Sequence, residues 1–360
     1  MGFPRLDIHL DAVRKNAEAL RALCGGHGID ITGVTKVFAA HPRLAQAYLD
    51  AGIERLGDSR VENLKRLGGL NAEKWLIRIP MLSEASDVVQ CADVSLNSEW
   101  RVIAALDEAA GKAGKTHGII LMSDLGDLRE GYVDGDELLR VAEKTSKLQH
   151  VRLRGVGVNM SCFSFIHPDI EKMNQLANLA ARLPMDKPPV VSGGNSATLH
   201  LMMQNGVPSG VNNIRLGESL LFGRERCCYN YLEGTRRDAF LLRAEIVELK
   251  EKPSLSWGEA GVDSYGNAPK RQADRGIRKK AVLALGKLDC DIDTMRPVDG
   301  NIEVLGASSD HLMIDVTDSR EALRVGDEVA FELGYFALMR AFASQYVEKQ
   351  FFDQGSPCPV

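Results

Sequence analysis

The feature that most constrains the fold of this chain is a regular alternation of short apolar strands with helical segments. Three segments, which begin at Leu44, Val102 and Leu138, place apolar residues at the i, i+3, i+4, i+7 spacing of an amphipathic helix. Helical segments separate eight candidate strands, at residues 30–36, 53–57, 74–79, 93–96, 118–123, 152–159, 189–192 and 213–216. Eight strands with helices between them predict a (β/α)8 TIM-type barrel.

The pattern changes after residue 237, where helical spacing nearly vanishes. Short, partly alternating strands broken by Gly, Pro and Asp follow, at residues 240–249, 280–285, 302–305, 312–316 and 328–333. We therefore expect a barrel domain over residues 1–237, an all-β domain over 238–353 and a flexible tail over 354–360. Residues 1–10 include a strand that we expect to pair with the β domain.

Two glycine-containing loops follow the seventh and eighth strands. They are Ser192-Gly-Gly-Asn-Ser-Ala197, which includes Asn195 and Ser196, and the segment 213–219. In a closed barrel such loops can hold a phosphate through backbone N–H groups. The first strand delivers a single lysine, Lys36, and the eighth carries Arg215. Together these residues suggest pyridoxal phosphate (PLP), bound to Lys36 as a Schiff base.

Charge and cysteine content exclude several classes of protein. The chain has 44 basic and 49 acidic residues, a net charge of −5, and these are interspersed, which does not favour binding to nucleic acid or anionic membranes. Its seven cysteines show no CxxC spacing, which favours a reducing cytoplasm and indicates neither a disulfide framework nor a zinc site. The first ten residues do not resemble a signal peptide, and no apolar run approaches the roughly 18 residues of a membrane span.

Several blocks in the same order carry a resemblance that covers nearly the whole chain. They are the two loops above and the segments 5–16, 58–64, 124–132 and 306–315. In this order they resemble the alanine racemase superfamily (fold type III PLP enzymes), and within it the branch of ornithine racemases and alanine/ornithine racemases. The resemblance implies a PLP-dependent isomerase that interconverts L- and D-amino acids.

The resemblance assigns residues to the cofactor. Arg215 matches an arginine that faces the pyridine nitrogen, where a permanent donor would weaken the ring as an electron sink. Phosphate contacts are expected from Ser196, Gly217 and Glu218, and Tyr335 resembles a phosphate-binding tyrosine. The chain departs from alanine racemases at two positions, because their tyrosine four residues after the lysine is Ala40 here and their histidine beneath the ring is Asn159.

Catalysis by two bases is also implied by the resemblance. Lys36 would act on one face of Cα, and Tyr265 from a partner subunit on the other, with Arg129 assisting. Ser309 and Asp310 of the partner would receive the substrate carboxylate. The active sites are therefore expected to be shared across a homodimer, so that each dimer holds two composite sites.

The substrate is expected to be a small amino acid, and acidic residues near the mouth of the barrel favour a basic one such as ornithine. Glu130, Asp127 and Glu218 are the carboxylates concerned, with Glu130 as the predicted contact to the side-chain ammonium. Alanine or a broad range of amino acids are alternatives. A PLP-dependent lyase or decarboxylase and a non-catalytic PLP-binding protein are the other classes left open.

Overall fold

A computed structural model describes residues 2–204, 206–262 and 273–353. The chain divides into two compact units. One comprises the first residues through Ile8 together with Phe240–Phe352, and the other is His9–Ala239. Within the described residues, no helix is both long and apolar enough to cross a membrane. The predicted tail, 354–360, lies outside the described residues.

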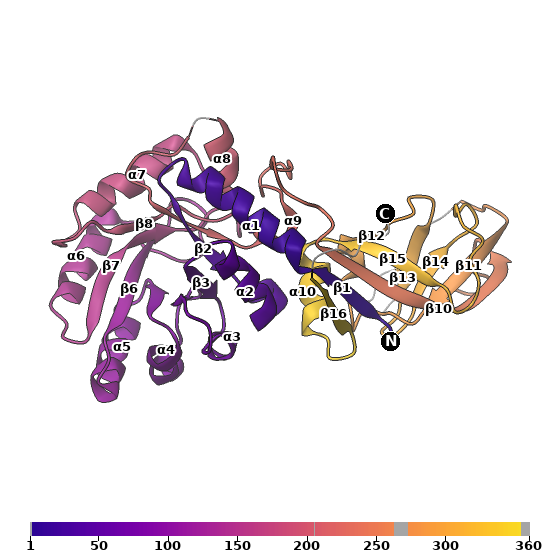
Figure 1. The fold of residues 1–360 in the computed structure, drawn as a ribbon, viewed down its shortest axis with the longest axis horizontal. Helices are drawn as coiled ribbons and strands as arrows, with labels where there is room; N and C mark the ends of the chain where they lie inside the picture. The colour runs from indigo at the N-terminus through magenta and orange to yellow at the C-terminus, as the bar shows by residue number, and fades with distance from the viewer. Residues whose placement is uncertain (1, 205, 263–272, 354–360) are drawn as a thin grey trace. The chain divides into compact units, whose positions relative to one another are not determined.

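The larger unit contains a closed barrel of eight parallel strands (Figure 1). The strands are β2 (Asp30–Val34), β3 (Arg55–Asp58), β4 (Glu73–Leu76), β5 (Val94–Asn97), β6 (His117–Ser123), β7 (Val151–Val158), β8 (Val190–Ser192) and β9 (Asn213–Leu216). Pairing of β9 with β2 closes the barrel, with Ile31 opposite Ile214 and Thr32 opposite Arg215. The predicted fold and all eight strand positions are confirmed, with ends that differ by at most three residues.

Helices connect the strands on the outside of the barrel (Figure 1). They are α1 (Leu10–Gly25), α2 (Pro42–Asp50), α3 (Val61–Arg66), α4 (Ala85–Cys91), α5 (Trp100–Ala113), α6 (Gly135–Ser146), α7 (Ile170–Ala181), α8 (Thr198–Gln204) and α9 (Glu218–Phe222). The predicted apolar faces are those that pack inward, since Leu44, Val102 and Leu138 are all buried. Fully buried side chains inside the barrel include Trp75, Leu96 and Met122.

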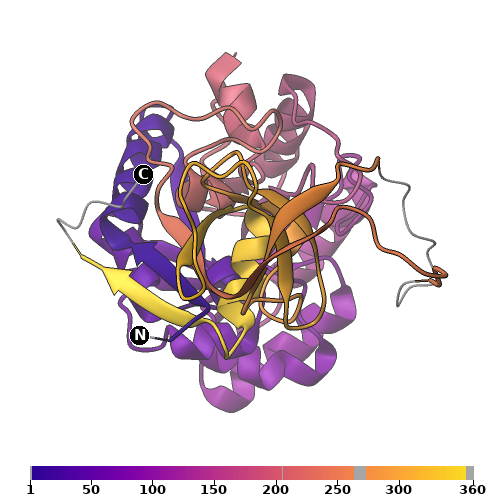
Figure 2. The same cartoon turned by 90° about the vertical axis from the view of Figure 1, so that its right-hand side faces the viewer.

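The smaller unit is an antiparallel β structure with one helix. Its elements are β1 (Arg5–His9), β10 (Phe240–Pro253), β11 (Ile277–Leu283), β12 (Met295–Pro297), β13 (Glu303–Ala307), β14 (Leu312–Asp315), β15 (Glu328–Leu333), α10 (Tyr335–Ala343) and β16 (Glu348–Phe352). As predicted, β1 joins this sheet, where it pairs with β10 and β16 (Figure 2). The sequence patterns missed β12, α10 and β16. The helix α10 is short and lies between Gly334 and Ser344. Nearly all of its residues are apolar, so its sequence shows little of the alternation of polar and apolar residues that marks an amphipathic helix.

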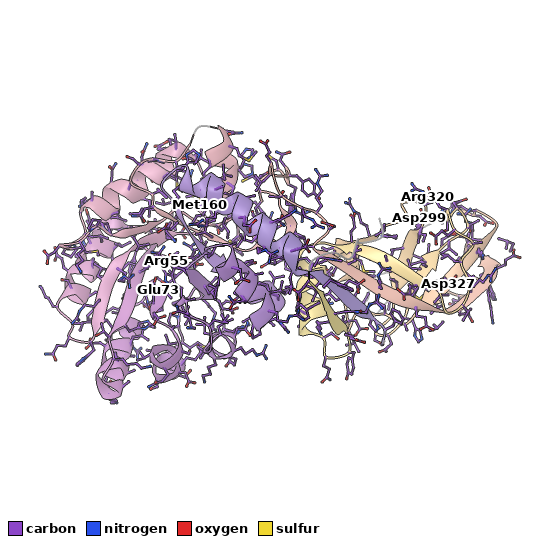
Figure 3. The ribbon with its side chains drawn as sticks, viewed as in Figure 1. Arg55, Glu73, Met160, Asp299, Arg320 and Asp327 are labelled. Atoms are coloured by element: carbon purple, nitrogen blue, oxygen red, sulfur yellow. The ribbon has the colours of Figure 1, made fainter. Side chains whose placement is uncertain are left out.

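Loops of the smaller unit are held by carboxylates that accept backbone N–H groups. Asp299 accepts from Asn301 N (3.0 Å) and Arg320 N (2.9 Å), and Asp327 accepts from Arg324 N (2.7 Å). Figure 3 labels Asp299 and Asp327. Such short-range bonds explain how polar turns between the strands are fixed in place.

The amino-terminal end of the barrel, where the strands begin, is closed by ion pairs. Arg55 on β3 contacts Asp30 (2.9 Å) and Glu73 (3.1 Å), and Arg154 on β7 contacts the other oxygen of Glu73 (2.9 Å). Figure 3 labels Arg55 and Glu73 at this end. At this end of the barrel, the charged groups pair with one another.

Candidate active site

Lys36 lies two residues after the end of β2, at the carboxyl end of the barrel, and begins a 3-10 turn, Lys36–Phe38. The residue before it is fixed: Thr35 Oγ1 donates to Asp58 Oδ2 (2.6 Å), and Thr35 N donates to Gly57 O (2.9 Å) on the neighbouring strand. These bonds hold the backbone from which Lys36 extends, so its side chain projects from a rigid position.

The Lys36 side chain is accessible to solvent, yet the walls of the barrel mouth surround it. The resulting desolvation lowers the pKa of its ammonium group, and Arg129 adds to this effect. Cys162, Asp58 and Glu130 oppose the shift. Because the net pKa is below the ordinary lysine value, the neutral amine is easier to reach here than at an open surface.

Arg215, on β9, is 3% exposed and donates to three protein acceptors. They are Ser192 Oγ (2.6 Å), Val158 O (2.7 Å) and Asn159 Oδ1 (2.6 Å). Burial lowers the pKa of Arg215 to about 10, which leaves the guanidinium charged at neutral pH. Two of its five N–H groups have no protein acceptor among the described residues. Glu218, three residues after Arg215, pairs with Arg224 (3.1 Å) and Arg226 (3.3 Å).

A continuous chain of side chains runs from Arg215 to Arg129. Arg215 donates to Asn159 Oδ1, Asn159 Nδ2 donates to Glu130 Oε1, and Arg129 donates to both oxygens of Glu130. Asn159 is the residue that the resemblance aligns with the histidine of alanine racemases. Its carbonyl oxygen accepts from Arg215 and its amide group donates to Glu130, so it links the two arginines in a fixed arrangement. A histidine could also bridge two groups, but Asn cannot gain or lose a proton near neutral pH.

The loops after β8 and β9 lie against each other. Ser219 N donates to Ser196 Oγ (3.2 Å), and Arg215 N donates to Gly194 O (3.0 Å). Gly194 has φ +104°, and a Cβ there would meet Thr198 Oγ1 at 2.8 Å, so the tight turn requires glycine. Gly217 precedes α9, and a Cβ there would lie 3.2 Å from Val34 Cβ.

The hydroxyl of Ser219 gives a direct test of whether a phosphate fits here. It is buried and, among the described residues, has no hydrogen-bond partner. An unsatisfied buried hydroxyl is costly, and a phosphate oxygen between the two loops would satisfy it. Sequence reasoning did not select Ser219, although it sits in the second loop beside Gly217 and Glu218. Asn195, which was selected, uses its side chain within the loop, donating to Met160 O (2.8 Å) and accepting from Ala197 N (2.9 Å).

The acidic residues expected at the mouth of the barrel have other roles. Asp127 is 1% exposed and accepts the backbone N–H groups of Cys162, Phe163 and Ser164, so it anchors the loop after β7. Glu218 is buried and neutralised by its two arginines. Both carboxylates are occupied by these protein contacts, and that they receive a substrate ammonium stays a prediction without support from this geometry.

Cys162 is a further residue of this region that the sequence pattern did not single out. It is exposed, its Sγ accepts from Asn195 Nδ2 (3.2 Å), and it is one of the ionisable groups that act on both Lys36 and Arg215. No spacing signal marks it, because its position depends on the fold of the loop that Asp127 anchors.

The remaining predicted residues belong to the smaller unit. Tyr265 lies outside the described residues. Tyr335 begins α10 and stacks edge-on against Phe336, with ring centroids 5.4 Å apart. Ser309 donates to the neighbouring Asp310, and Leu288 N donates to Ser309 O (3.1 Å), in an exposed turn before β14. In the larger unit, Ala40 is buried with φ +53°, where it ends the turn that carries Lys36.

Comparisons with known proteins agree on one family. Residues 8–225 match the model for the alanine racemase N-terminal domain. The chain is 42% identical over 351 residues to an ornithine racemase of Acetoanaerobium sticklandii, covering 97% of this chain and 99% of that one. A lysine racemase of Thermotoga maritima is 36% identical over 354 residues, covering 97% and 98%.

A similar fold is found among solved structures. The alanine racemase from Bartonella henselae with covalently bound pyridoxal phosphate superposes with a TM-score of 0.71 at 16% identity, covering 97% of this chain and 99% of that one. At this identity the likeness concerns the fold, and it extends over both the barrel and the β unit.

Proposed function

Because the chain belongs to the alanine racemase family, we propose that it is a PLP-dependent racemase of a basic amino acid, with ornithine as the first candidate. The observation that carries the proposal is the identity of 42% and 36%, over almost the whole chain, to racemases named for ornithine and lysine. Alanine and a broad range of amino acids are the alternative substrates, since the fold is also that of alanine racemases.

The residues at the carboxyl end of the barrel fit the cofactor. Lys36 would hold it covalently, and the phosphate would sit between Ser196 and the Gly217–Ser219 segment, where the hydroxyl of Ser219 lacks a partner. Arg215 has two spare N–H groups for the ring nitrogen. When bound, PLP would supply an electron-withdrawing ring that makes the Cα–H of the amino acid acidic.

Proton transfer on one face is assigned to Lys36. A base must be neutral to accept a proton, and the lowered pKa of Lys36 increases its neutral fraction near physiological pH. The chain of Asn159 and Glu130 fixes Arg215 and Arg129, and the positive charge of Arg129 contributes to the lowered pKa of Lys36. In this proposal Arg215 orients the ring, and Arg129 favours the neutral form of the lysine.

For the opposite face we propose Tyr265 of a second copy of the chain, together with Ser309 and Asp310 for the substrate carboxylate. The support is the family membership and the match of the segments 261–267 and 306–315. A homodimer with two composite sites follows from this assignment. We also propose the cytoplasm as its compartment, because the six described cysteines are all free thiols.

The test of a shared site is complementation. Lys36→Ala and Tyr265→Phe homodimers should each be nearly inactive. After mixing equal amounts with complete exchange, half of the dimers carry both lesions in one site and none in the other, so activity should return to about a quarter of the wild-type value. No recovery despite proven exchange would mean that Tyr265 acts within its own subunit or not at all.

The test of the reaction itself is loss of optical rotation by L-ornithine, L-lysine and L-alanine, with chiral chromatography to show that the amount of amino acid is conserved. A racemase loses rotation and retains mass. A lyase or decarboxylase loses mass, and a non-catalytic PLP-binding protein leaves both unchanged. Lys36→Ala is the matched control, which excludes a contaminating racemase.

A further inference from the structure

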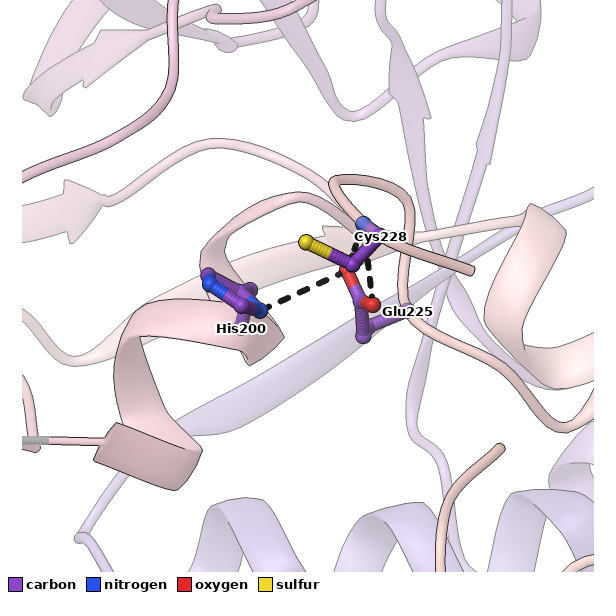
Figure 4. A group of neighbouring side chains, drawn as sticks. All are labelled: His200, Glu225 and Cys228. Atoms are coloured by element: carbon purple, nitrogen blue, oxygen red, sulfur yellow. Dashed lines mark hydrogen bonds and ion pairs between the residues drawn. The ribbon is translucent and has the colours of Figure 1, made fainter. Parts of the chain in front are cut away.

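Three potential metal ligands lie together behind the phosphate loops, on two elements of the larger unit. His200 is on α8, and Glu225 and Cys228 are in the turn that follows α9. Their ligand atoms all lie within 4.8 Å of one another. Figure 4 shows the imidazole of His200 and the thiol of Cys228 on the same side of the Glu225 carboxylate.

Glu225 is the fixed member of this group. Its side chain is fully buried, and its carboxylate accepts the backbone N–H groups of Cys227 (2.5 Å), Cys228 (3.0 Å) and Asn230 (2.8 Å). Glu225 N also donates to Asn230 O (3.0 Å), which closes the turn around the carboxylate. The carboxylate therefore cannot swing out to solvent without opening the turn.

Backbone N–H groups stabilise the charge of Glu225, but among the described residues it has no permanently charged side chain as a partner. The two flanking arginines, Arg224 and Arg226, both pair with Glu218 instead. Among the described residues, the ion-pair partner of Glu225 is His200, whose Nδ1 lies 3.8 Å from Oε2 and carries a charge only when protonated. A buried carboxylate without a permanent counter-charge is costly, and proteins commonly compensate such a charge with a cation or a metal.

We propose that His200, Glu225 and Cys228 bind a divalent transition-metal cation, with Zn²⁺ as the preferred ion. Imidazole nitrogen, thiolate sulfur and carboxylate oxygen are the ligands that Zn²⁺ takes, at about 2.0–2.3 Å. The ligand atoms of His200 and Cys228 lie within 4.8 Å of the carboxylate, and both side chains would have to close around a cation there. Water or His167, whose ring centroid lies 6.2 Å from that of His200, can complete a fourth position.

The site joins two elements that begin at the phosphate loops. The helix α8 follows the loop of Ser196, and the Glu225 turn follows the loop of Gly217, while Arg226 N donates to Ser196 O (3.3 Å). A bound cation would cross-link these elements and raise the thermal stability of the larger unit by binding only the folded state. No sequence motif marks this group, because His200 is 28 positions from Cys228 and the short spacings of common metal-binding motifs are absent between them.

The test is calorimetric titration of the reduced holoenzyme with Zn²⁺. We expect one ion per chain, with affinity reduced by at least about tenfold in Cys228→Ser and in His200→Gln. Cys227→Ser is the matched control, because the thiol of Cys227 faces Ala197 O (3.4 Å) instead of the group, and it should bind Zn²⁺ like the wild type. Titration with Co²⁺ should give a thiolate charge-transfer band that Cys228→Ser abolishes and Cys227→Ser keeps.

A second measurement uses the wild-type protein alone, so that it does not depend on how the variants fold. Zn²⁺ should slow alkylation of Cys228 by iodoacetamide, measured by peptide mass spectrometry, without slowing alkylation of Cys162. The proposal would be overturned if Zn²⁺ did not bind in a stoichiometric amount. It would also be overturned if the bound Zn²⁺ neither protected Cys228 nor responded to the Cys228 and His200 substitutions.

Discussion

The two ends of the barrel use the same kinds of side chain for different purposes. At the amino-terminal end, Glu73 accepts from Arg55, Arg154 and the indole of Trp75. At the carboxyl end, Glu130 accepts from Arg129 and Asn159, and Asn159 accepts in turn from Arg215. Each end therefore has a carboxylate that accepts from an arginine and from a second side chain on another strand or loop.

The difference lies in what remains unsatisfied. At the amino-terminal end, Arg55 and Arg154 are paired with Asp30 and Glu73 across the strands. At the carboxyl end, Arg215 keeps two donors, Ser219 keeps a free hydroxyl, and Lys36 has a lowered pKa. Unsatisfied groups are costly in folding, and they are useful where a ligand completes them. Substitutions at one end should therefore alter activity, and at the other end stability.

The largest effect on activity is expected from Lys36→Ala. Loss of the covalent anchor and of one base should lower kcat/KM for racemisation by at least about a thousandfold. The protein should also lose the visible absorbance that borohydride removes. Peptide mass spectrometry after borohydride treatment checks this. A reduced adduct on another lysine in the variant would show that Lys36 is not the anchor.

A smaller loss is expected from Arg215→Gln, which keeps a donor amide and removes the charge. We expect kcat to fall by about a hundredfold to a thousandfold, as for loss of a fixed electrostatic contact. Formation of keto acid should rise relative to D-amino acid, because the Gln amide oxygen can accept from a protonated ring nitrogen, whereas Arg can only donate. Chiral and keto-acid assays of the same reaction check the ratio, and an unchanged ratio would count against contact between Arg215 and the ring nitrogen.

At the amino-terminal end of the barrel, we predict that a buried histidine makes the stability of the protein fall at acid pH. His117 begins β6 and is 1% exposed, its Nδ1 donates to Ala92 O (3.1 Å), and its Nε2 is 2.8 Å from Ser95 Oγ. Burial lowers the pKa of His117 from 6.5 to about 4, although the bond to Ala92 opposes the shift. Between these values the unfolded chain binds a proton that the native protein does not, so stability falls as the pH falls from 6.5 towards 4.

The loss reaches about 3 kcal/mol at the acid end of that range, from a shift of about 2.5 pKa units. Urea unfolding at pH 7, 6, 5 and 4 measures it. His117→Gln, which cannot be protonated, should show a smaller decrease over the same range. An identical pH dependence in the variant would assign the acid sensitivity to other groups.

Parts of this arrangement could be predicted from the sequence and others could not. The apolar periods placed the eight strands, and the small residues of the loops placed Ser196, Gly217 and Arg215 at one end of the barrel. These signals are local, since each depends on a few neighbouring positions. The anchoring role of Asp127 is not local, because it depends on a loop about 35 residues further along the chain. The Asn159–Glu130 bond and the group around Glu225 are equally non-local.

The smallest effects should come from replacing the carboxylate at each end of the barrel, Glu130 at the carboxyl end and Glu73 at the amino-terminal end. Glu130→Gln leaves Arg129 without its full charge partner and loosens the chain to Arg215, so kcat should fall by about tenfold for both ornithine and alanine, the loss expected from one charged hydrogen bond. The earlier expectation that Glu130 binds the substrate ammonium makes a different prediction, a rise in KM confined to ornithine. Steady-state kinetics with both substrates separates the two roles.

Glu73→Gln is the matched substitution at the other end. It removes the charge shared by Arg55 and Arg154, whose side chains are 24% and 39% exposed, so solvent screening limits the cost to about 1 kcal/mol of unfolding free energy. Its kcat and KM should equal those of the wild type, because no group of the carboxyl end contacts Glu73. If Glu73→Gln lowered kcat as much as Glu130→Gln does, the division between a stabilising and a functional end of the barrel would be wrong.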